Sequence, residues 1–267
     1  MVVVSIRLSR SCDLASRALA GPVFSLLFAS VLCGCGAAPS DDRAPTDADA
    51  QPAPADPYAT TQPFAADPQG EATRRGLEGA FAASVVRFEP GEGAGFGAAA
   101  MPWVVLGGPR GAGDARGSID VVSLGTGGVI ELAFGKTAIV DAPGPDFIVF
   151  ENAFRFGAGG RTYAEFGRVS VSDDGVRWVD LPCNAATGEG CAGRAPVFAN
   201  VETNTLACTD PALAGGDAFD LEASGLARAR FVRVTDLGTY PASSATSDGK
   251  GGFDLDAIAV IHGANDP

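Results

Sequence analysis

The chain has 267 residues, of which 46% are hydrophobic, and its formal net charge is −13 at pH 7. This length allows one large all-β domain or two small ones, and the 36 glycines and 18 prolines indicate many turns and few long helices. A nucleic-acid partner is excluded, because binding phosphates requires a clustered Lys/Arg surface and the 19 basic residues are scattered along the chain.

The first 34 residues have the composition of an export signal. Arginines between positions 7 and 17 form a basic region, and the apolar stretch 18–32 is too short and too interrupted by Pro22 for a transmembrane helix. The segment LCGC, which ends at Cys35, resembles the lipobox cleaved by the lipoprotein signal peptidase. This resemblance implies cleavage before Cys35, diacylation of its thiol with fatty acids such as palmitate, and stable membrane anchoring. An ordinary secretory signal is the alternative, and either signal exports the protein.

Residues 35–70 are rich in Ala, Pro, Asp and Thr and contain almost no large apolar side chain. Such a segment cannot bury enough surface to offset its ordering entropy, so we expect a disordered linker between the lipid anchor and the folded part. A short helix is predicted over 70–81, at the start of a single folded domain that spans 71–264.

From residue 84 onward, short apolar segments alternate with turn residues. Strands are predicted at 84–90, 118–124, 129–134, 146–152, 166–172, 176–181, 229–237 and 254–261. Asp174 and Gly175 predict a type I′ turn that joins two of these strands. Because no βαβ rhythm is present, the pattern favours an all-β sandwich of two sheets, of jelly-roll type.

Three segments are similar, in this order, to the C-terminal half of discoidin-like, galactose-binding-like domains. They are VSVSDDGVRW (169–178), RARFVRVTDL (228–237) and DLDAIAVIHG (254–263). The similarity implies a jelly-roll β-sandwich and says little about the ligand. The long inserts at 181–228 and 236–252 depart from that pattern, so no sugar-binding or lipid-binding site is transferred from those domains.

A closer likeness covers most of the predicted domain. Segments 117–134, 144–154, 215–221 and 251–261 resemble a set of exported bacterial cell-surface proteins and lipoproteins, largely of unassigned function. This resemblance implies a location at the cell surface, most simply on the outer membrane.

Acidic residues interrupt two otherwise apolar predicted strands. In GGFDLDAIAVI, strand alternation places Asp254 and Asp256 on one face, roughly 6 to 7 Å apart. In DFIVFEN, Asp146 begins the segment and Glu151 and Asn152 end it. Oxygen atoms of these residue types are the ligands of Ca²⁺, so the five residues together predict a calcium site. The alternative is that they cap turns and accept hydrogen bonds from backbone N–H groups.

Cysteines 183 and 191 enclose a short loop that a disulfide could close in an oxidising compartment, although Cys208 could compete for either partner. His262 is the sole histidine, and no nucleophile-elbow motif accompanies it, so a catalytic triad is not indicated.

These observations predict a cell-surface lipoprotein that acts as a non-catalytic binding or adhesion module for a carbohydrate or another surface ligand, with calcium stabilising its loops. One alternative is a carbohydrate-active hydrolase that uses paired carboxylates. Another is a structural envelope protein without a small ligand.

Overall fold

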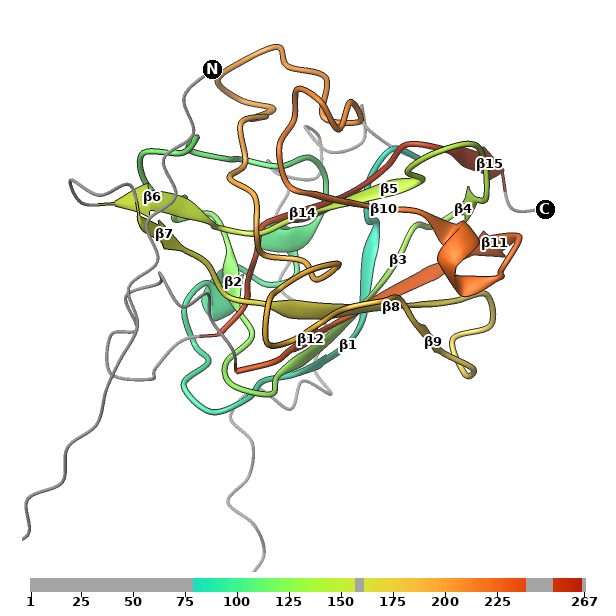
Figure 1. Ribbon diagram of the computed structural model, residues 1–267, viewed down its shortest axis with the longest axis horizontal. Coiled ribbons are helices and arrows are strands. Elements are labelled where there is room, and N and C mark those ends of the chain that lie inside the picture. Colours follow the sequence, from blue (N-terminus) through green and yellow to red (C-terminus); the bar gives the residue numbers. More distant parts are fainter. Residues whose placement is uncertain (1–78, 157–160, 239–251, 266–267) are drawn as a thin grey trace, which may run out of the picture. The chain divides into compact units, whose positions relative to one another are not determined.

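A computed structural model describes residues 79–156, 161–238 and 252–265 (Figure 1). Its largest sheet is antiparallel and has five strands in the order β1-β3-β12-β8-β9. These strands are Ser84–Glu89, Val129–Ala133, Phe231–Asp236, Gly167–Ser172 and Val179–Asp180. Along β12, half-buried and buried residues alternate, as expected of a strand with one face on a core.

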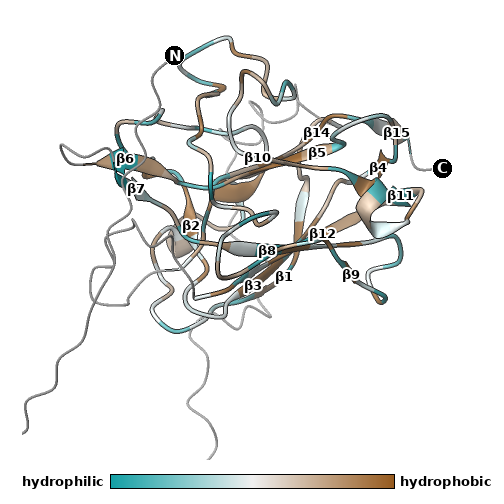
Figure 2. Cartoon of the chain, viewed as in Figure 1, coloured by the Kyte–Doolittle hydropathy of each residue, from teal (hydrophilic) through white to brown (hydrophobic). Residues whose placement is uncertain are grey.

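A second antiparallel sheet, in the order β10-β5-β14, carries the most apolar strands. Its strands are Asp217–Phe219, Phe147–Phe150 and Ala257–Val260. Every residue of β5 and β14 is buried, and Figure 2 shows how apolar both strands are. Because both faces of these strands are covered, their sequences are continuously apolar and do not alternate.

The remaining elements are short. A sheet in the order β11-β4-β15 consists of Arg228–Ala229, Thr137–Val140 and Gly263–Asn265. Two-stranded sheets are formed by β13 (Asp254–Leu255) with β2 (Val122–Ser123), and by β6 (Phe154–Phe156) with β7 (Arg161–Tyr163). The helical segments within the described ranges are three 3-10 turns: η1 (Ala98–Ala100), η2 (Trp103–Val105) and η3 (Leu221–Ser224). In Figure 1, β2, β6 and β7 lie on the left, and β4, β11 and β15 lie on the right.

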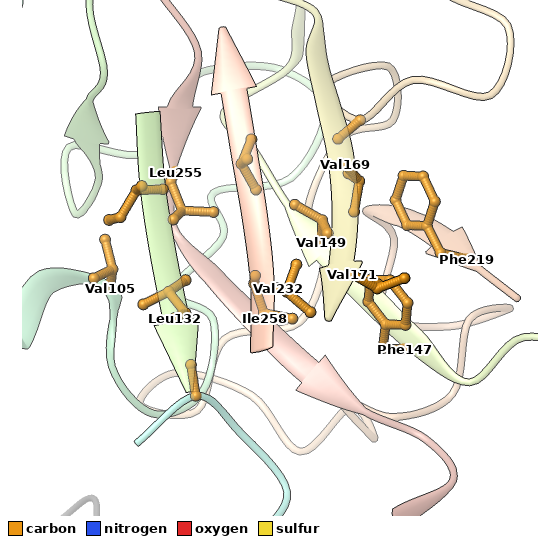
Figure 3. Packing of buried hydrophobic residues seen from close by; sticks show 14 of the residues in the cluster. Val105, Leu132, Phe147, Val149, Val169, Val171, Phe219, Val232, Leu255 and Ile258 are labelled. Atoms are coloured by element: carbon orange, nitrogen blue, oxygen red, sulfur yellow. The ribbon is translucent and has the colours of Figure 1, made fainter. Parts of the chain in front are cut away.

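The main hydrophobic core lies between the five-stranded sheet and the β10-β5-β14 sheet. Figure 3 shows Leu132, Val171 and Val232 of the larger sheet beside Val149 and Ile258 of the smaller one. All five side chains are fully buried. The described part of the chain is therefore an all-β structure in which antiparallel sheets pack across a shared core, and the prediction of this class is confirmed.

A smaller apolar cluster covers the opposite face of the β10-β5-β14 sheet. Ile148 and Phe150 of β5 pack there with Val197, Ala199 and Ala214, which come from the long segment between β9 and β10. This segment corresponds to the predicted insert at 181–228, and its packing explains why β5 is buried on both faces.

Each predicted strand segment contains strand residues, although 118–124 is reduced to β2 and 176–181 to β9. The prediction misses β4, β6, β7, β10 and β15, because each has only three or four residues and lacks a clear alternation. The predicted helix at 70–81 lies mostly outside the described residues, and its end is not helical, since Phe81 forms a β-bridge with Ala259. The predicted signal peptide and linker also lie outside the described ranges.

The turn between β8 and β9 differs from the predicted type I′ turn. Six residues, 173–178, separate the two strands. The Asp174 carboxylate accepts hydrogen bonds from the backbone N–H groups of Val176 and Arg177, at 2.9 and 2.7 Å. The prediction of a two-residue turn is wrong because this side-chain cap holds a wider loop.

The predicted alternation along 253–260 is also wrong. Phe253 and Leu255 lie in the main core, but so do Ile258 and Val260, while Ala257 and Ala259 pack in the smaller cluster. The alternation therefore shifts by one residue between β13 and β14. At this point Asp256 leaves the pairing with β2, and its backbone N–H donates to the Phe150 carbonyl as the chain joins β5. Asp254 and Asp256 contact different groups: Asp254 lies against the Asn152 amide, whereas Asp256 accepts from the Arg110 N–H.

Candidate functional site

The five residues of the predicted calcium site fall into three separate environments. Asp146 precedes β5, whereas Glu151 and Asn152 follow it. Five residues of extended chain span roughly 17 Å, so the two ends of β5 cannot share one ion. Asp254 joins the Glu151 end through Asn152, whose Nδ2 lies 3.5 Å from Asp254 Oδ2. Asp256 forms a third environment.

Asp146 is fully buried and fully hydrogen-bonded. Its Oδ1 accepts from the N–H of Ala142 at 3.1 Å and lies 2.9 Å from Nδ1 of His262, and its Oδ2 accepts from the N–H of Leu221 at 2.8 Å. These contacts match the capping alternative, because both oxygens satisfy donors of the protein itself.

Asp146 also belongs to a group with Asp141 and Asp220, whose carboxylate oxygens lie within 4.8 Å of one another. Asp141 is exposed, and Asp220 caps η3 by accepting from the N–H of Glu222 at 2.8 Å. Protein donors already occupy the buried oxygens of this group, so its geometry gives no indication of an ion.

Asp256 is 3% exposed, and both of its carboxylate oxygens accept from the backbone N–H of Arg110 at 3.0 Å. Burial raises the pKa of Asp256 well above its usual range, and the Arg110 N–H partly opposes that rise. Asp256 therefore acts as an anchor for the segment that begins at Arg110.

Glu151, Glu165 and Asp254 form what we call the carboxylate cluster. Glu151 follows β5, Glu165 lies two residues after β7, and Asp254 opens β13. Glu151 and Glu165 are each only 1% exposed. The three groups are close enough that the charges of Asp254 and Glu165 both raise the pKa of Glu151. The ends of three different elements thus bring three carboxylates near one another, two of them buried and Asp254 half-buried.

Hydrogen bonds satisfy this cluster only in part. Among the residues that the structure describes, both carboxylate oxygens of Glu151 and the Oε2 of Glu165 are buried without a hydrogen-bond partner. The Oε1 of Glu165 accepts from the Tyr163 hydroxyl at 3.3 Å. An ionised carboxylate buried without a partner costs several kcal/mol, so these oxygens favour binding of a proton or a cation.

The pKa values of the three carboxylates also favour binding of a proton or a cation. Burial, followed by the charges of Asp254 and Glu165, raises the pKa of Glu151 well above its usual value. Burial and the charge of Asp254 raise the pKa of Glu165 to about 8, and burial raises that of Asp254 to about 6. Without a cation, the cluster therefore retains protons at neutral pH.

Asn152 organises the rim of the cluster. Its Oδ1 accepts a short hydrogen bond from the backbone N–H of Ser118, and its Nδ2 faces Asp254. Because the amide oxygen already has a donor, Asn152 links the carboxylates to the 117–118 segment and is less suited to be a direct ligand. A cation would also have to draw the three carboxylates closer together, since they are spaced more widely than those of the Asp146 group.

Glu165 is a site residue that the sequence pattern did not predict. It lies between Ala164 and Phe166, and all three residues are buried. A single acid inside an apolar run is the signal that could have found it, because Glu is rarely buried without a partner. Tyr163, its neighbour in the site, is fixed by ring stacking on Phe154 across the β6–β7 hairpin, with ring centroids 5.2 Å apart.

Gly117 and Ser118 line a pocket of about 710 Å³, and Ser118 is linked to the rim of the cluster through Asn152. Two stretches of chain line it, within 110–120 and 198–204. Arg110 forms ion pairs in this pocket with Asp120 and Glu202, each at 2.8 Å.

The predicted disulfide between Cys183 and Cys191 is present. Cys208 is a half-buried free thiol, so it does not compete for either partner. Cys35, the predicted lipidation site, lies outside the described residues.

The chain matches no model of a known protein family and no curated protein. Within the described ranges, no helix has the length and apolar character needed to cross a bilayer.

Proposed function

We propose that this protein is an exported lipoprotein of the cell envelope whose β domain is a non-catalytic binding or adhesion module stabilised by Ca²⁺. The observation that carries the calcium proposal is the carboxylate cluster, in which Glu151 and Glu165 are 1% exposed and leave three oxygens without a partner among the described residues. A divalent cation would replace the protons that the cluster otherwise retains.

The donor set favours calcium over other metals. All three groups of the cluster are carboxylates, which suit hard cations, and Ca²⁺ accepts irregular sets of six to eight oxygen ligands. Zinc is disfavoured because the lone histidine, His262, is bonded to Asp146 at the opposite end of β5, and two described cysteines form a disulfide. Glu151, Glu165 and Asp254 are the proposed ligands, with Asn152 as their organiser.

The finer fold assignment is part of the same proposal. Two antiparallel sheets packed across one core support a jelly-roll sandwich of the galactose-binding-like type. The likeness of the 144–154 and 251–261 segments to exported bacterial cell-surface proteins supports a surface location. These two segments contain Glu151, Asn152 and Asp254, so the likeness includes part of the proposed site.

Export and anchoring rest on the first 35 residues and are supported by the Cys183–Cys191 disulfide, because disulfides persist mainly in oxidising compartments. The membrane is thus a partner through the acyl chains on Cys35. Metabolic labelling with palmitate tests this proposal. The full chain is expected to incorporate label that the Cys35→Ser variant loses, and label retained by the variant would exclude Cys35 as the lipidation site.

One observation favours a second function. The pKa of Glu165 is raised to about 8 and that of Asp254 to about 6, and such a difference suits a general acid and a general base in a glycoside hydrolase. Burial argues against this function, because Glu165 is 1% exposed and a substrate must reach the acid. Polysaccharide turnover that is lost in Glu165→Gln would support the hydrolase.

The calcium proposal is tested by thermal melts of the full chain, purified in detergent, with Ca²⁺ and with a chelator. Calcium is expected to raise the melting temperature of the wild type and to leave Glu151→Gln unchanged. Glu189→Gln is the matched control, since Glu189 is exposed and is not among the groups that shift the pKa of Glu151. Equal melts of the wild type in both conditions would refute the calcium proposal.

A further inference from the structure

We propose that the pocket between 110–120 and 198–204 binds a neutral oligosaccharide, and that the cation at the carboxylate cluster orders the wall of this pocket. The inference rests on the proposed function for its calcium dependence. Beyond that function, the inference names the binding pocket, the chemical class of the ligand and the contacts through which the cation affects ligand binding.

The size and lining of the pocket suit a small ligand. Its volume of about 710 Å³ lies within the range of small-molecule sites. Phe198 and Ile119 line the pocket, and 43% and 85% of these residues are exposed to solvent. An aromatic ring beside hydrogen-bonding groups can hold the apolar face of a sugar ring.

The charges of the pocket select a neutral ligand. Arg110 lies between Asp120 and Glu202, so a donor group is flanked by two acceptors. With Arg116, which also lines the pocket, two positive side chains balance two negative ones. An anion or a cation would meet a like charge in this arrangement. Hydroxyl groups can both donate to the carboxylates and accept from the guanidinium groups.

The wall of the pocket is held at two points by the aspartates of the 254–256 segment. At one point, both oxygens of Asp256 accept from the Arg110 N–H. At the other, Asp254 faces Asn152, which in turn accepts from the Ser118 N–H. The Ser118 hydroxyl closes the loop by donating to the Arg110 carbonyl at 2.9 Å.

This arrangement transmits cation binding to the pocket. A cation that draws Asp254 toward Glu151 and Glu165 fixes the Asn152 amide, and the amide fixes Ser118, which lines the pocket. The Asn152 amide also packs closely against Gly117, because a β-carbon at this position would lie 2.8 Å from the Asn152 Oδ1. A ligand that requires the ordered wall therefore binds more tightly when the cation is present.

The test is binding of the full chain, in detergent, to an array of immobilised neutral, uronic-acid and amino-sugar oligosaccharides, with Ca²⁺ and with a chelator. Neutral oligosaccharides are expected to bind in Ca²⁺, and chelation is expected to weaken that binding at least fivefold. Phe198→Ala is expected to weaken it at least tenfold. Val176→Ala is the control, because Val176 is 80% exposed on the 173–178 loop and does not line the pocket.

Binding restricted to charged glycans, binding unchanged in Phe198→Ala, or binding unaffected by chelation would each overturn the inference. Melting temperatures of the same samples separate it from the proposed function. If Ca²⁺ raises the melting temperature but no glycan binds, the pocket inference fails alone, and a structural envelope protein becomes the better account. If Ca²⁺ leaves the melting temperature unchanged, the calcium proposal fails.

Discussion

Each end of β5 is followed or preceded by a buried acid, and the two acids differ in whether their oxygens have hydrogen-bond donors. At its start, Asp146 is buried and each of its oxygens has a donor. At its end, Glu151 is equally buried, and neither of its oxygens has a partner among the described residues. A buried acid is therefore not by itself a sign of function. The difference lies in whether the protein satisfies the acid, which makes the first end a structural cap and the second a candidate cation site.

The largest expected effect is at the satisfied end. Asp146→Ala leaves the N–H groups of Ala142 and Leu221 without their acceptor, and removing one partner of such a buried network costs about 3–5 kcal/mol. Urea unfolding should show this loss equally with Ca²⁺ and with a chelator. Asp141→Ala, in the same turn but exposed, should change stability by less than about 0.5 kcal/mol. If the loss of stability in Asp146→Ala depended on calcium, the cation would bind near Asp146 and not at the carboxylate cluster.

Calcium binding at the unsatisfied end should have the next largest effect. Free Ca²⁺ at a hundred times its Kd should stabilise the wild type by about 2.7 kcal/mol, measured by urea unfolding. Glu151→Gln should lose this gain. In a chelator, the same variant should be no less stable than the wild type, because Glu151 then retains its proton and glutamine is a neutral side chain of the same size. A large loss of stability in the chelator would instead show that Glu151 has a structural partner.

The free energy of unfolding should depend on pH through the carboxylate cluster. In the folded protein the pKa of Glu165 is raised from 4.5 to about 8, so the folded state binds more protons than the unfolded state between these values. Without calcium, this contribution to stability is fully present below about pH 4.5 and is lost as the pH rises through about 8.

Denaturant unfolding in a chelator, measured across this pH range, tests the dependence. Glu165→Gln should remove part of the decline. The other groups that face this position, Glu151, Asp254, Asp236 and Tyr163, remain in place, and the raised pKa values of Glu151 and Asp254 keep the rest of the decline. Calcium should stabilise more at high pH, because it competes with the protons. A decline that is as steep in Glu165→Gln as in the wild type would contradict this account.

The smallest expected effect is local. Asn152→Ala should speed hydrogen exchange at the Ser118 amide by about tenfold or more, since the net contribution of one hydrogen bond is about 1 kcal/mol or somewhat above. The Arg110 amide, held by Asp256, is the internal control and should change little. In the wild type, Ca²⁺ should slow exchange at Ser118. Equal exchange in the variant and the wild type would break the proposed link between the cluster and the pocket.

The sequence was sufficient to predict the all-β class and most of the long strands. Along β12 buried and half-buried residues alternate, and in the sequence of β8 valine and serine alternate. The sequence was insufficient at 253–260, where the chain changes partner strands at Asp256 and the alternation shifts. A continuous pattern in the sequence does not reveal such a change, since both faces of β14 are buried.

The candidate site was predicted only in part, for a related reason. Glu151, Asn152 and Asp254 were identified from their positions at strand ends, but Asp146 and Asp256 were assigned to the same site although they lie in different environments. Glu165 was missed because its proximity to Asp254 depends on how three distant elements meet. Whether an acid is satisfied is also a property of the fold, because its donors come from remote backbone groups such as the N–H of Leu221.

The most direct test of the central claim is the stoichiometry of calcium bound to the full chain, measured by equilibrium dialysis with radioactive Ca²⁺. The wild type and Asp141→Ala should bind an ion that Glu151→Gln does not bind. Binding that survives in Glu151→Gln and is lost in Asp141→Ala, or a wild type that binds no calcium, would contradict the assignment of the cation to the carboxylate cluster.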